Sequence, residues 1–216
     1  MPLHTADALV LRTYKLGEAD RIVVFLTRDR GKKRGVAQGA RRPRSRFSGA
    51  LEPLTEVRLA YFEWERRELV SLNYAEPIQS PLRAPNPEAL GYSHYFAELI
   101  DAWAADADPD ERMFRLGASV LEALAQGTEV EPLARYFECW LLRLQGVYPA
   151  DLDLSRGAGA FVEGTRRVSP TDVASLSASA HVLSELEHAH RGIIEGHLER
   201  ELKSVKVVNE IKRSIS

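Results

Sequence analysis

The sequence predicts a two-domain α+β protein, with a β-rich domain at residues 1–80 and an all-helical domain at residues 81–216. Three observations support this prediction. Short runs of β-forming residues with an apolar period of two fill the first part. Beyond a proline-rich linker the apolar period becomes 3.6, as in amphipathic helices. The first part holds 15 basic and 10 acidic side chains and the second 14 and 21, although the whole chain has a net charge of -2.

Five strands are expected in the first domain, at residues 8–14, 21–27, 33–38, 55–62 and 68–75. The fourth run alternates polar and apolar residues, which is typical of a half-buried strand. It ends in two aromatic residues, Tyr61 and Phe62, and only one of them can point into the core because strand neighbours face opposite sides. Five short strands in about 80 residues suit a small barrel or a sandwich.

Three helices are expected next, because apolar stripes with helical spacing lie within residues 92–103, 113–124 and 133–144. The second helix is predicted to start at Asp108-Pro109, as an N-cap followed by a first-turn proline. Gly127 and Gly146 are predicted to end the second and third helices. The three helices should pack against one another.

An irregular insert is expected at residues 148–170, where Phe161-Val162 is the one segment that could form a short strand. Two further helical patterns follow, at residues 171–188 and 191–215, and the second is predicted to break near Ser204.

Composition limits the cellular context. No apolar run reaches the length of a membrane span, and the N-terminal residues lack the pattern of a signal peptide, so we expect a cytoplasmic protein. The single cysteine, Cys139, excludes an intrachain disulfide. It lies beside Trp140 in an apolar helix, which predicts a buried structural thiol rather than a nucleophile.

Catalytic and cofactor motifs are absent from the sequence. It contains neither the GxSxG nucleophile motif nor the GxxxxGK[ST] phosphate loop. One cysteine and scattered histidines give no zinc signature. We therefore expect a protein that is not an enzyme and holds no cofactor and no metal.

The strongest functional signal is a basic segment at residues 31–49, which contains no acidic residue. Pro43 blocks a helix there, and arginine suits phosphate oxygens, so the segment favours nucleic-acid binding. Phe47 offers a ring on which a base could stack. A solvated surface loop is the alternative interpretation, and the glycine and arginine content indicates a mobile loop. The candidate DNA-binding residues are Lys32, Lys33, Arg34, Arg41, Arg42, Arg44, Arg46 and Phe47.

Residues 9–53 also carry a longer pattern: Leu11-Arg12, Gly17-Glu18, Asp20, Thr27, Gly31, Gly39-Ala40-Arg41-Arg42, Ser45-Arg46 and Leu51-Glu52-Pro53. This pattern resembles the N-terminal domain of the bacterial DNA repair and recombination family RecO. The segments YFECWLLRLQGVYP (136–149) and LERELKS (198–204) are similar to the same family, so the resemblance extends over nearly the whole chain.

The resemblance implies an OB-fold domain followed by a helical domain. It also implies a nucleoid-associated mediator of the RecF pathway that binds single- and double-stranded DNA and anneals complementary strands. Such a protein works with RecR and with the C-terminal tail of the single-stranded DNA-binding protein SSB, so that RecA can load. Many members carry a four-cysteine zinc module after Val-Tyr-Pro, whereas residues 151–159 here contain no cysteine. We therefore expect no zinc and an insert held by packing alone.

The acidic helical domain is assigned to protein partners. An apolar groove between Trp103 and Trp140 could receive a hydrophobic peptide tail, although a tryptophan taken individually is more often a core residue. The candidates for binding the peptide carboxylate are Arg135, Arg143 and Lys203. Two alternative functions remain open: an RNA-binding OB-fold module, and an adaptor whose basic loop binds an acidic protein.

Overall fold

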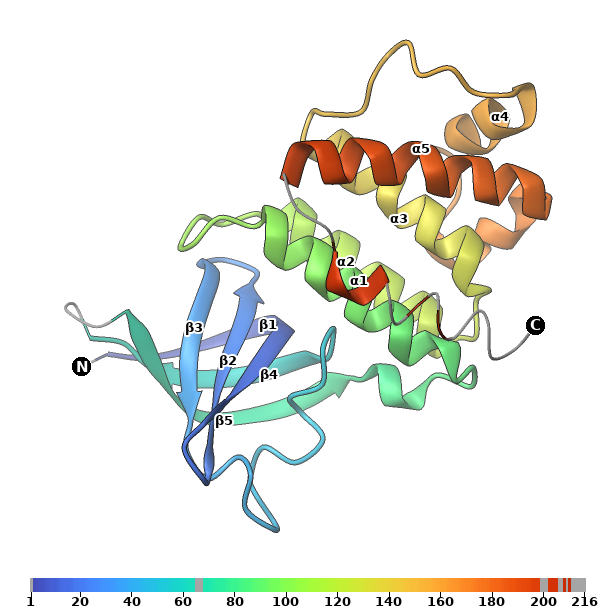
Figure 1. Cartoon of the computed structure of the whole chain (residues 1–216). Helices are drawn as coiled ribbons and strands as arrows, with labels where there is room; N and C mark the ends of the chain where they lie inside the picture. Colours follow the sequence, from blue (N-terminus) through green and yellow to red (C-terminus); the bar gives the residue numbers. More distant parts are fainter. Residues whose placement is uncertain (1, 65–67, 199–201, 206–207, 209, 211–216) are drawn as a thin grey trace.

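The computed structural model describes residues 2–64, 68–198, 202–205, 208 and 210. Its first part is a closed five-stranded barrel of the OB type, which confirms the predicted fold class (Figure 1). The strands follow one another around the barrel in the order β1-β2-β3-β5-β4, and β4 closes the barrel against β1. Only the β3–β5 pairing is parallel among the described strands. The strands are β1 (Leu3–Leu16), β2 (Asp20–Thr27), β3 (Gly31–Ala37), β4 (Glu56–Phe62) and β5 (Leu69–Gln79).

All five predicted strands are present, and β1 and β5 are longer than the sequence suggested. Tyr61 is fully buried inside the barrel whereas Phe62 is half-buried, as expected for neighbours on one strand. A β-bulge between Val10 and Arg12 interrupts the alternation of β1. Val10 therefore packs inside the barrel, while Arg12 reaches Asp101 in the helical part.

The second part is helical throughout (Figure 1). Its elements are η1 (Pro81–Arg83), α1 (Glu88–Trp103), α2 (Glu111–Ala125), α3 (Val130–Leu144), α4 (Arg156–Gly164), η2 (Pro170–Leu176) and α5 (Ala180–Leu198), where η denotes a 3₁₀ helix. The N-cap of α2 is Asp110 and not Asp108, because the Asp110 carboxylate accepts the N–H of Met113 at 2.9 Å. Gly127 and Gly146 follow α2 and α3 with φ of 83° and 69°, as predicted.

The later helices correct the sequence-based expectation. Phe161 and Val162 lie in α4 and not in a strand. The segment predicted as one helix at 171–188 is a 3₁₀ helix followed by the first half of α5, and α5 runs on to Leu198. No helix breaker separates residues 188 and 191, and the buried stripe Leu186, His190 and Ile194 is continuous. The remainder of the predicted 191–215 helix falls largely outside the described residues.

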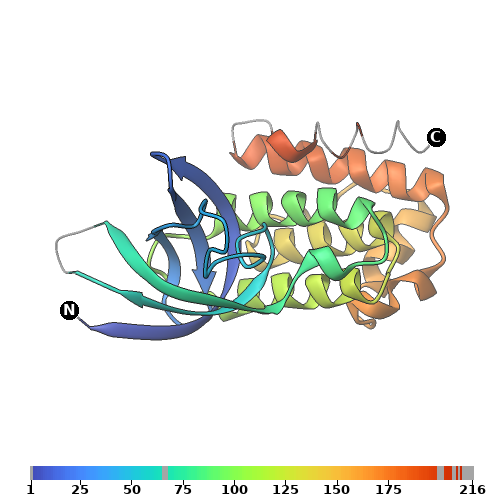
Figure 2. The same cartoon turned by 90° about the horizontal axis from the view of Figure 1, so that it is seen from below.

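The outer face of the barrel and the helices share an apolar core, which is separate from the core inside the barrel. Leu9, Leu11 and Leu26 face outward from β1 and β2 and pack against α1 and α2. Gly117 of α2 permits this approach, since a Cβ there would lie 2.5 Å from Leu9 Cδ1. Figure 2 shows the barrel at one end of the molecule and the helices at the other.

A second connection lies along β3. The Ala107 N–H donates to the Lys32 carbonyl at 3.0 Å, and the Lys32 N–H donates to Ala105 at 3.4 Å. The α1–α2 connection therefore runs beside the first half of β3 as a short parallel pairing.

Candidate nucleic-acid interface

The structure divides the basic segment into two parts. Lys32, Lys33 and Arg34 lie on β3, whereas the four arginines that follow lie on the loop between β3 and β4. Figure 1 shows this loop at the end of the barrel that lies away from α5. The two groups differ in their partners, and this difference decides which residues can reach a ligand.

The two lysines of β3 are held inside the protein. Lys32 Nζ donates to the Asp101 carbonyl at 2.8 Å and lies 3.5 Å from the Asp101 carboxylate. Lys33 Nζ pairs with Glu63 at 2.7 Å. Their side chains are only 11% and 12% exposed. Both lysines therefore fix the fold, and a phosphate would have to displace a carboxylate to reach them.

Arg34 is different because both members of its ion pair face solvent. Its guanidinium lies 3.6 Å from the Asp106 carboxylate, and the two side chains are 49% and 62% exposed. Such an exposed pair contributes little to stability, so Arg34 remains free to exchange its partner.

The loop is attached to the β1–β2 turn by several hydrogen bonds. Arg41 donates to the carbonyls of Gly17 and Glu18 at 2.9 and 3.0 Å, and its own N–H donates to Ala19. The Gly39 N–H donates to the Asp20 carboxylate at 2.8 Å. These bonds attach the first residues of the loop to the barrel.

Phe47 does not provide the stacking ring that the sequence suggested. Its side chain is 2% exposed and packs with Val10 and Phe25 in the barrel core. The loop folds back so that Phe47 and Ala50 fill the end of the barrel, and the hydrophobic effect favours that burial. Arg46 remains outside, with its guanidinium carbon 5.1 Å from the centroid of the Phe47 ring.

The arginines of the loop are exposed. Arg41, Arg42, Arg44 and Arg46 form no ion pair with any carboxylate among the described residues. Arg44 adopts a positive φ of 59°, which turns the chain sharply between its neighbours. Four positive charges therefore stand together on one loop and face solvent.

A groove of about 530 Å³ lies beside the loop. It is bounded by loop residues 47–49, by β1 and β2, and by His94 of α1. Arg12 and Arg21 contribute its basic lining from the strands: Arg21 donates to the Thr13 hydroxyl at 3.0 Å, and Arg12 pairs with Asp101 at 2.8 Å. Burial lowers the pKa of His94, which favours its neutral form.

Arg12 and Arg21 were missed as candidate site residues because each lies inside a predicted strand. Their positions in the sequence, close to either side of the turn at Gly17, could have identified them. That turn brings the end of β1 and the start of β2 to the loop.

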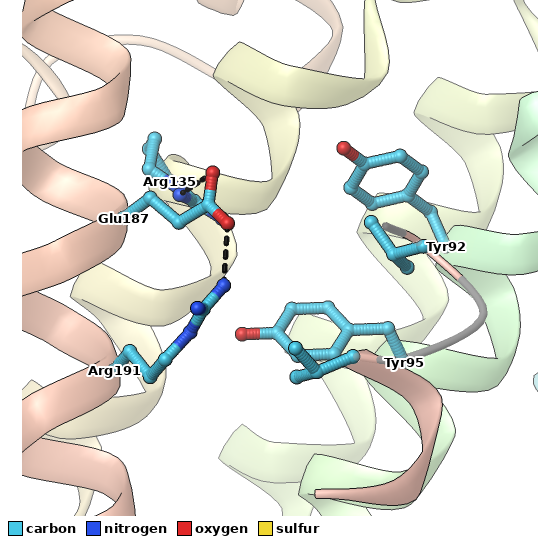
Figure 3. Close-up of a pocket in the computed structure, with 7 residues that line it drawn as sticks. Tyr92, Tyr95, Arg135, Glu187 and Arg191 are labelled. Carbon is cyan, nitrogen blue, oxygen red and sulfur yellow. Dashed lines mark hydrogen bonds and ion pairs between the residues drawn. The ribbon is translucent and has the colours of Figure 1, made fainter. Parts of the chain in front are cut away.

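The candidate peptide-binding residues of the helical domain largely have internal partners. Arg135 is 5% exposed and pairs with Glu138 at 2.7 Å and with Glu187 at 3.3 Å. Figure 3 shows Glu187 between Arg135 and Arg191, with Tyr92 and Tyr95 opposite. The cavity there is about 20 Å³, which is the size of a water molecule rather than of a peptide side chain.

Glu138 connects three helices in the same region. Its carboxylate accepts a hydrogen bond from Tyr95 on α1 at 2.7 Å and lies 2.9 Å from His190 Nδ1 on α5. Burial, followed by the charge of Glu138, raises the pKa of Tyr95 well above its ordinary value. Cys139 is fully buried beside this cluster, which confirms the predicted structural thiol.

Arg143 and Trp140 hold the insert that follows α3. Arg143 donates to the Thr165 hydroxyl at 2.9 Å and to the Val162 carbonyl at 2.8 Å. Trp140 Nε1 donates to the Thr165 carbonyl at 3.1 Å. These bonds satisfy the C-terminal end of α4, so the insert is not held by packing alone, as the sequence had suggested.

The other end of α4 is held by Ser155. Its N–H and hydroxyl both donate to the Glu185 carboxylate at 2.6 Å, and these hydrogen bonds lower the pKa of Glu185.

Trp103 and Lys203 lie on a different side of the helical part. The Trp103 ring stacks on His197 with centroids 5.7 Å apart, and its Nε1 has no hydrogen-bond partner within the described chain. Lys203 is exposed, and its backbone N–H donates to Glu98. The two tryptophans of the predicted groove thus contact different partners. Trp103 stacks on His197, and Trp140 donates to the Thr165 carbonyl.

The described residues offer neither a metal-binding cluster nor a membrane-spanning helix. They contain no cluster of three or more His, Cys, Asp or Glu side chains suited to a metal ion. None of the described helices is long and apolar enough to cross a membrane.

Comparison with known proteins identifies the two parts separately. The family model described as "Recombination protein O N terminal" matches residues 1–81, and "Recombination protein O C terminal" matches residues 84–158. Curated relatives named "DNA repair protein RecO" include those of Koribacter versatilis and Desulforudis audaxviator. The first is 44% identical over 149 residues, which is 68% of this chain and 60% of the relative. The second is 38% identical over 172 residues, which is 79% of this chain and 67% of the relative.

A third relative, from Pelotomaculum thermopropionicum, is 37% identical over 69% of this chain and 57% of its own length. The chain thus spans about 60% of the length of the curated relatives it matches. Both family models fall on the two parts of the fold described above, and together they cover most of the chain. The chain belongs to the recombination protein O (RecO) family.

Proposed function

We propose that this chain is a DNA-binding mediator of recombinational repair that uses the β3–β4 loop of the barrel to bind DNA. It binds single- and double-stranded DNA, anneals complementary strands, and acts with RecR and the SSB tail in loading RecA. Membership of the RecO family supports the repair role, since its curated relatives are named DNA repair proteins.

One observation carries the DNA-binding proposal. The four loop arginines are exposed, share one short loop beside a groove, and have no carboxylate partner among the described residues. In contrast, Lys32 and Lys33 are already neutralised inside the protein. A cluster of guanidinium groups without carboxylate partners suits the phosphates of a polyanion, because each planar fork donates to phosphate oxygens.

The binding chemistry follows from these charges. Arginine–phosphate contacts release condensed counterions, so affinity falls as salt rises. Contacts to phosphates carry no sequence information, and binding is therefore nearly independent of sequence. A protein that screens two phosphate backbones also lowers their mutual repulsion, which favours annealing.

The helical domain supplies the surface for protein partners. Arg135 and Arg143 serve the fold through their internal bonds, so Lys203 is the candidate that remains for a peptide carboxylate.

The test replaces Arg41, Arg42, Arg44 and Arg46 by alanine together. Fluorescence anisotropy with labelled single strands, duplexes and RNA of one sequence is measured across a salt series. If all four arginines contact phosphates, the slope of log affinity against log salt for single strands becomes shallower by about 2.8, at about 0.7 for each phosphate. The matched control replaces four exposed arginines of the helical domain: Arg112, Arg115, Arg166 and Arg167.

The outcomes separate the alternatives. Unchanged affinity in the loop variant removes the loop from the binding surface. A clear preference for RNA favours an RNA-binding module, and no nucleic-acid binding at low salt favours a protein adaptor.

A further inference from the structure

Tyr14 is an exposed aromatic residue with no role in the fold described so far. It is 42% exposed, and it is the only tyrosine, phenylalanine or tryptophan among the described residues that is exposed rather than buried or half-buried. Leu16, two residues further along β1, is 38% exposed. A strand that displays two large apolar side chains side by side leaves surface that a ligand can cover.

Arg12 is paired with the Tyr14 ring. Its guanidinium carbon lies 5.0 Å from the ring centroid, within the range of a cation–π contact. The Arg12 Nε also binds the Asp101 carboxylate, whose side chain is 6% exposed, so its position is fixed from the helical part. The Tyr14 ring is therefore supported on one side by a held arginine.

Tyr14 lies close to the basic loop. The turn that follows β1 presents the Gly17 and Glu18 carbonyls to Arg41, and Ala19 accepts the Arg41 N–H. Only two residues separate Tyr14 from the first of these carbonyls. The loop arginines and Tyr14 thus occupy the same end of the barrel.

Two adjoining cavities connect the loop with Tyr14. The groove beside the loop shares Arg12, Pro53 and His94 with a second cavity of about 340 Å³. Tyr14 lines the second cavity together with the carboxylates of Glu98 and Asp101. Arg12 and Lys203 line the same cavity and balance these two charges, so this cavity suits an uncharged base, whereas the loop suits the phosphate backbone.

We propose that Tyr14, supported by Arg12, stacks on an unpaired base of a single DNA strand whose phosphates are bound by the loop arginines. This inference rests on the proposed DNA-binding function. Base stacking on an aromatic ring is tolerant of sequence, which agrees with binding through phosphates. In a duplex the bases are already paired and stacked, so Tyr14 contributes to single strands and not to duplexes.

The test compares Tyr14→Ala and Tyr14→Phe with the unmodified chain. Anisotropy titrations use a labelled 20-nucleotide single strand and the duplex of the same sequence. Loss of one stacking contact weakens single-strand binding by roughly 5- to 150-fold in Tyr14→Ala, with duplex binding changed less than about twofold. Tyr14→Phe keeps single-strand binding because it keeps the ring. The salt slope stays constant, since no charge is removed.

Tyr74→Ala provides a matched control, because Tyr74 is a half-buried tyrosine of β5 that lines neither cavity. Circular dichroism checks that each variant is folded. Equal loss of single-strand and duplex binding in Tyr14→Ala, or no loss of either, overturns the stacking role. If only that role is wrong, the loop-arginine variant still loses affinity. If the unmodified chain binds neither DNA, the proposed function fails as well.

Discussion

Replacing Arg143 by alanine tests whether this residue holds the insert or binds a partner. The sequence assigned it to a partner carboxylate, whereas the structure gives it two hydrogen bonds to the last turn of α4. Its guanidinium carbon also lies 5.5 Å from the Trp140 ring centroid and 5.4 Å from that of Tyr148. A positive charge at this position is favourable because the carbonyl end of a helix carries partial negative charge.

The magnitude follows from these contacts. Hydrogen bonds that involve a charged group contribute about 1.5 kcal/mol each at the lower end, and exposed cation–π contacts about 0.5 kcal/mol each. The sum is about 4 kcal/mol. Because Arg143 is half-buried, water replaces part of what is lost, so we expect the free energy of unfolding to fall by about 2–3 kcal/mol in Arg143→Ala. Arg143→Lys keeps the charge but cannot form both bonds, so about half of that loss is expected.

Urea unfolding followed by tryptophan fluorescence measures the change. With a denaturant dependence of about 2 kcal/mol/M, the unfolding midpoint of Arg143→Ala shifts by roughly 1 M. Hydrogen exchange locates the effect, since amides of α4 lose protection first. Arg167→Ala is the control, because this exposed arginine lies beyond the same helix and its removal changes stability by less than about 0.5 kcal/mol. If Arg143→Ala unfolds like the unmodified chain and α4 keeps its protection, the structural role is refuted.

Two further predictions concern stability. Burial raises the pKa of the Cys139 thiol from 9.0 to about 12, so between these values the unfolded chain releases a proton that the folded chain keeps. Stability therefore falls as pH rises, by about 1 kcal/mol between pH 9 and pH 10. Urea titrations of Cys139→Ala lack this component of the pH dependence. An identical pH dependence in the variant contradicts the assignment. Gly31→Ala should lose more stability in urea unfolding than Gly49→Ala, although both glycines have a positive φ. Both variants incur the left-handed backbone cost of about 1–2 kcal/mol, but only a Cβ at Gly31 meets backbone, 2.3 Å from Asp108 N. Equal losses would show that the close approach of Asp108 does not matter.

The strands and the first three helices could be predicted because their signals are local. Alternation and helical stripes report which side of a segment is buried, and glycines such as Gly127 and Gly146 mark helix ends directly. The barrel type came from the resemblance of residues 9–53 to a known family, since five short strands alone fit a sandwich equally well.

The site was harder to predict because its residues depend on contacts between distant parts of the chain. Nothing near Lys32 in the sequence indicates that Asp101, 69 residues away, neutralises its charge. Phe47 stands among arginines in the sequence, yet the loop folds back and buries it. In the sequence Tyr14 resembles any other strand residue. Its exposure is evident only from the structure of the folded barrel. The glycines of α4 weakened its helical pattern in the sequence. In the structure, Arg143 of the preceding helix holds α4 in place.

The core between the barrel and the helices determines how a strand bound as proposed above would be presented. Leu9, Leu11 and Leu26 cannot leave α1 and α2 without uncovering apolar surface to water, and the backbone bonds of Lys32 would break as well. Rotation of one domain against the other is therefore opposed on two sides of the contact. A ligand bound by the barrel would therefore keep one orientation relative to the helical part. Changing that orientation would require release and rebinding rather than bending of the protein.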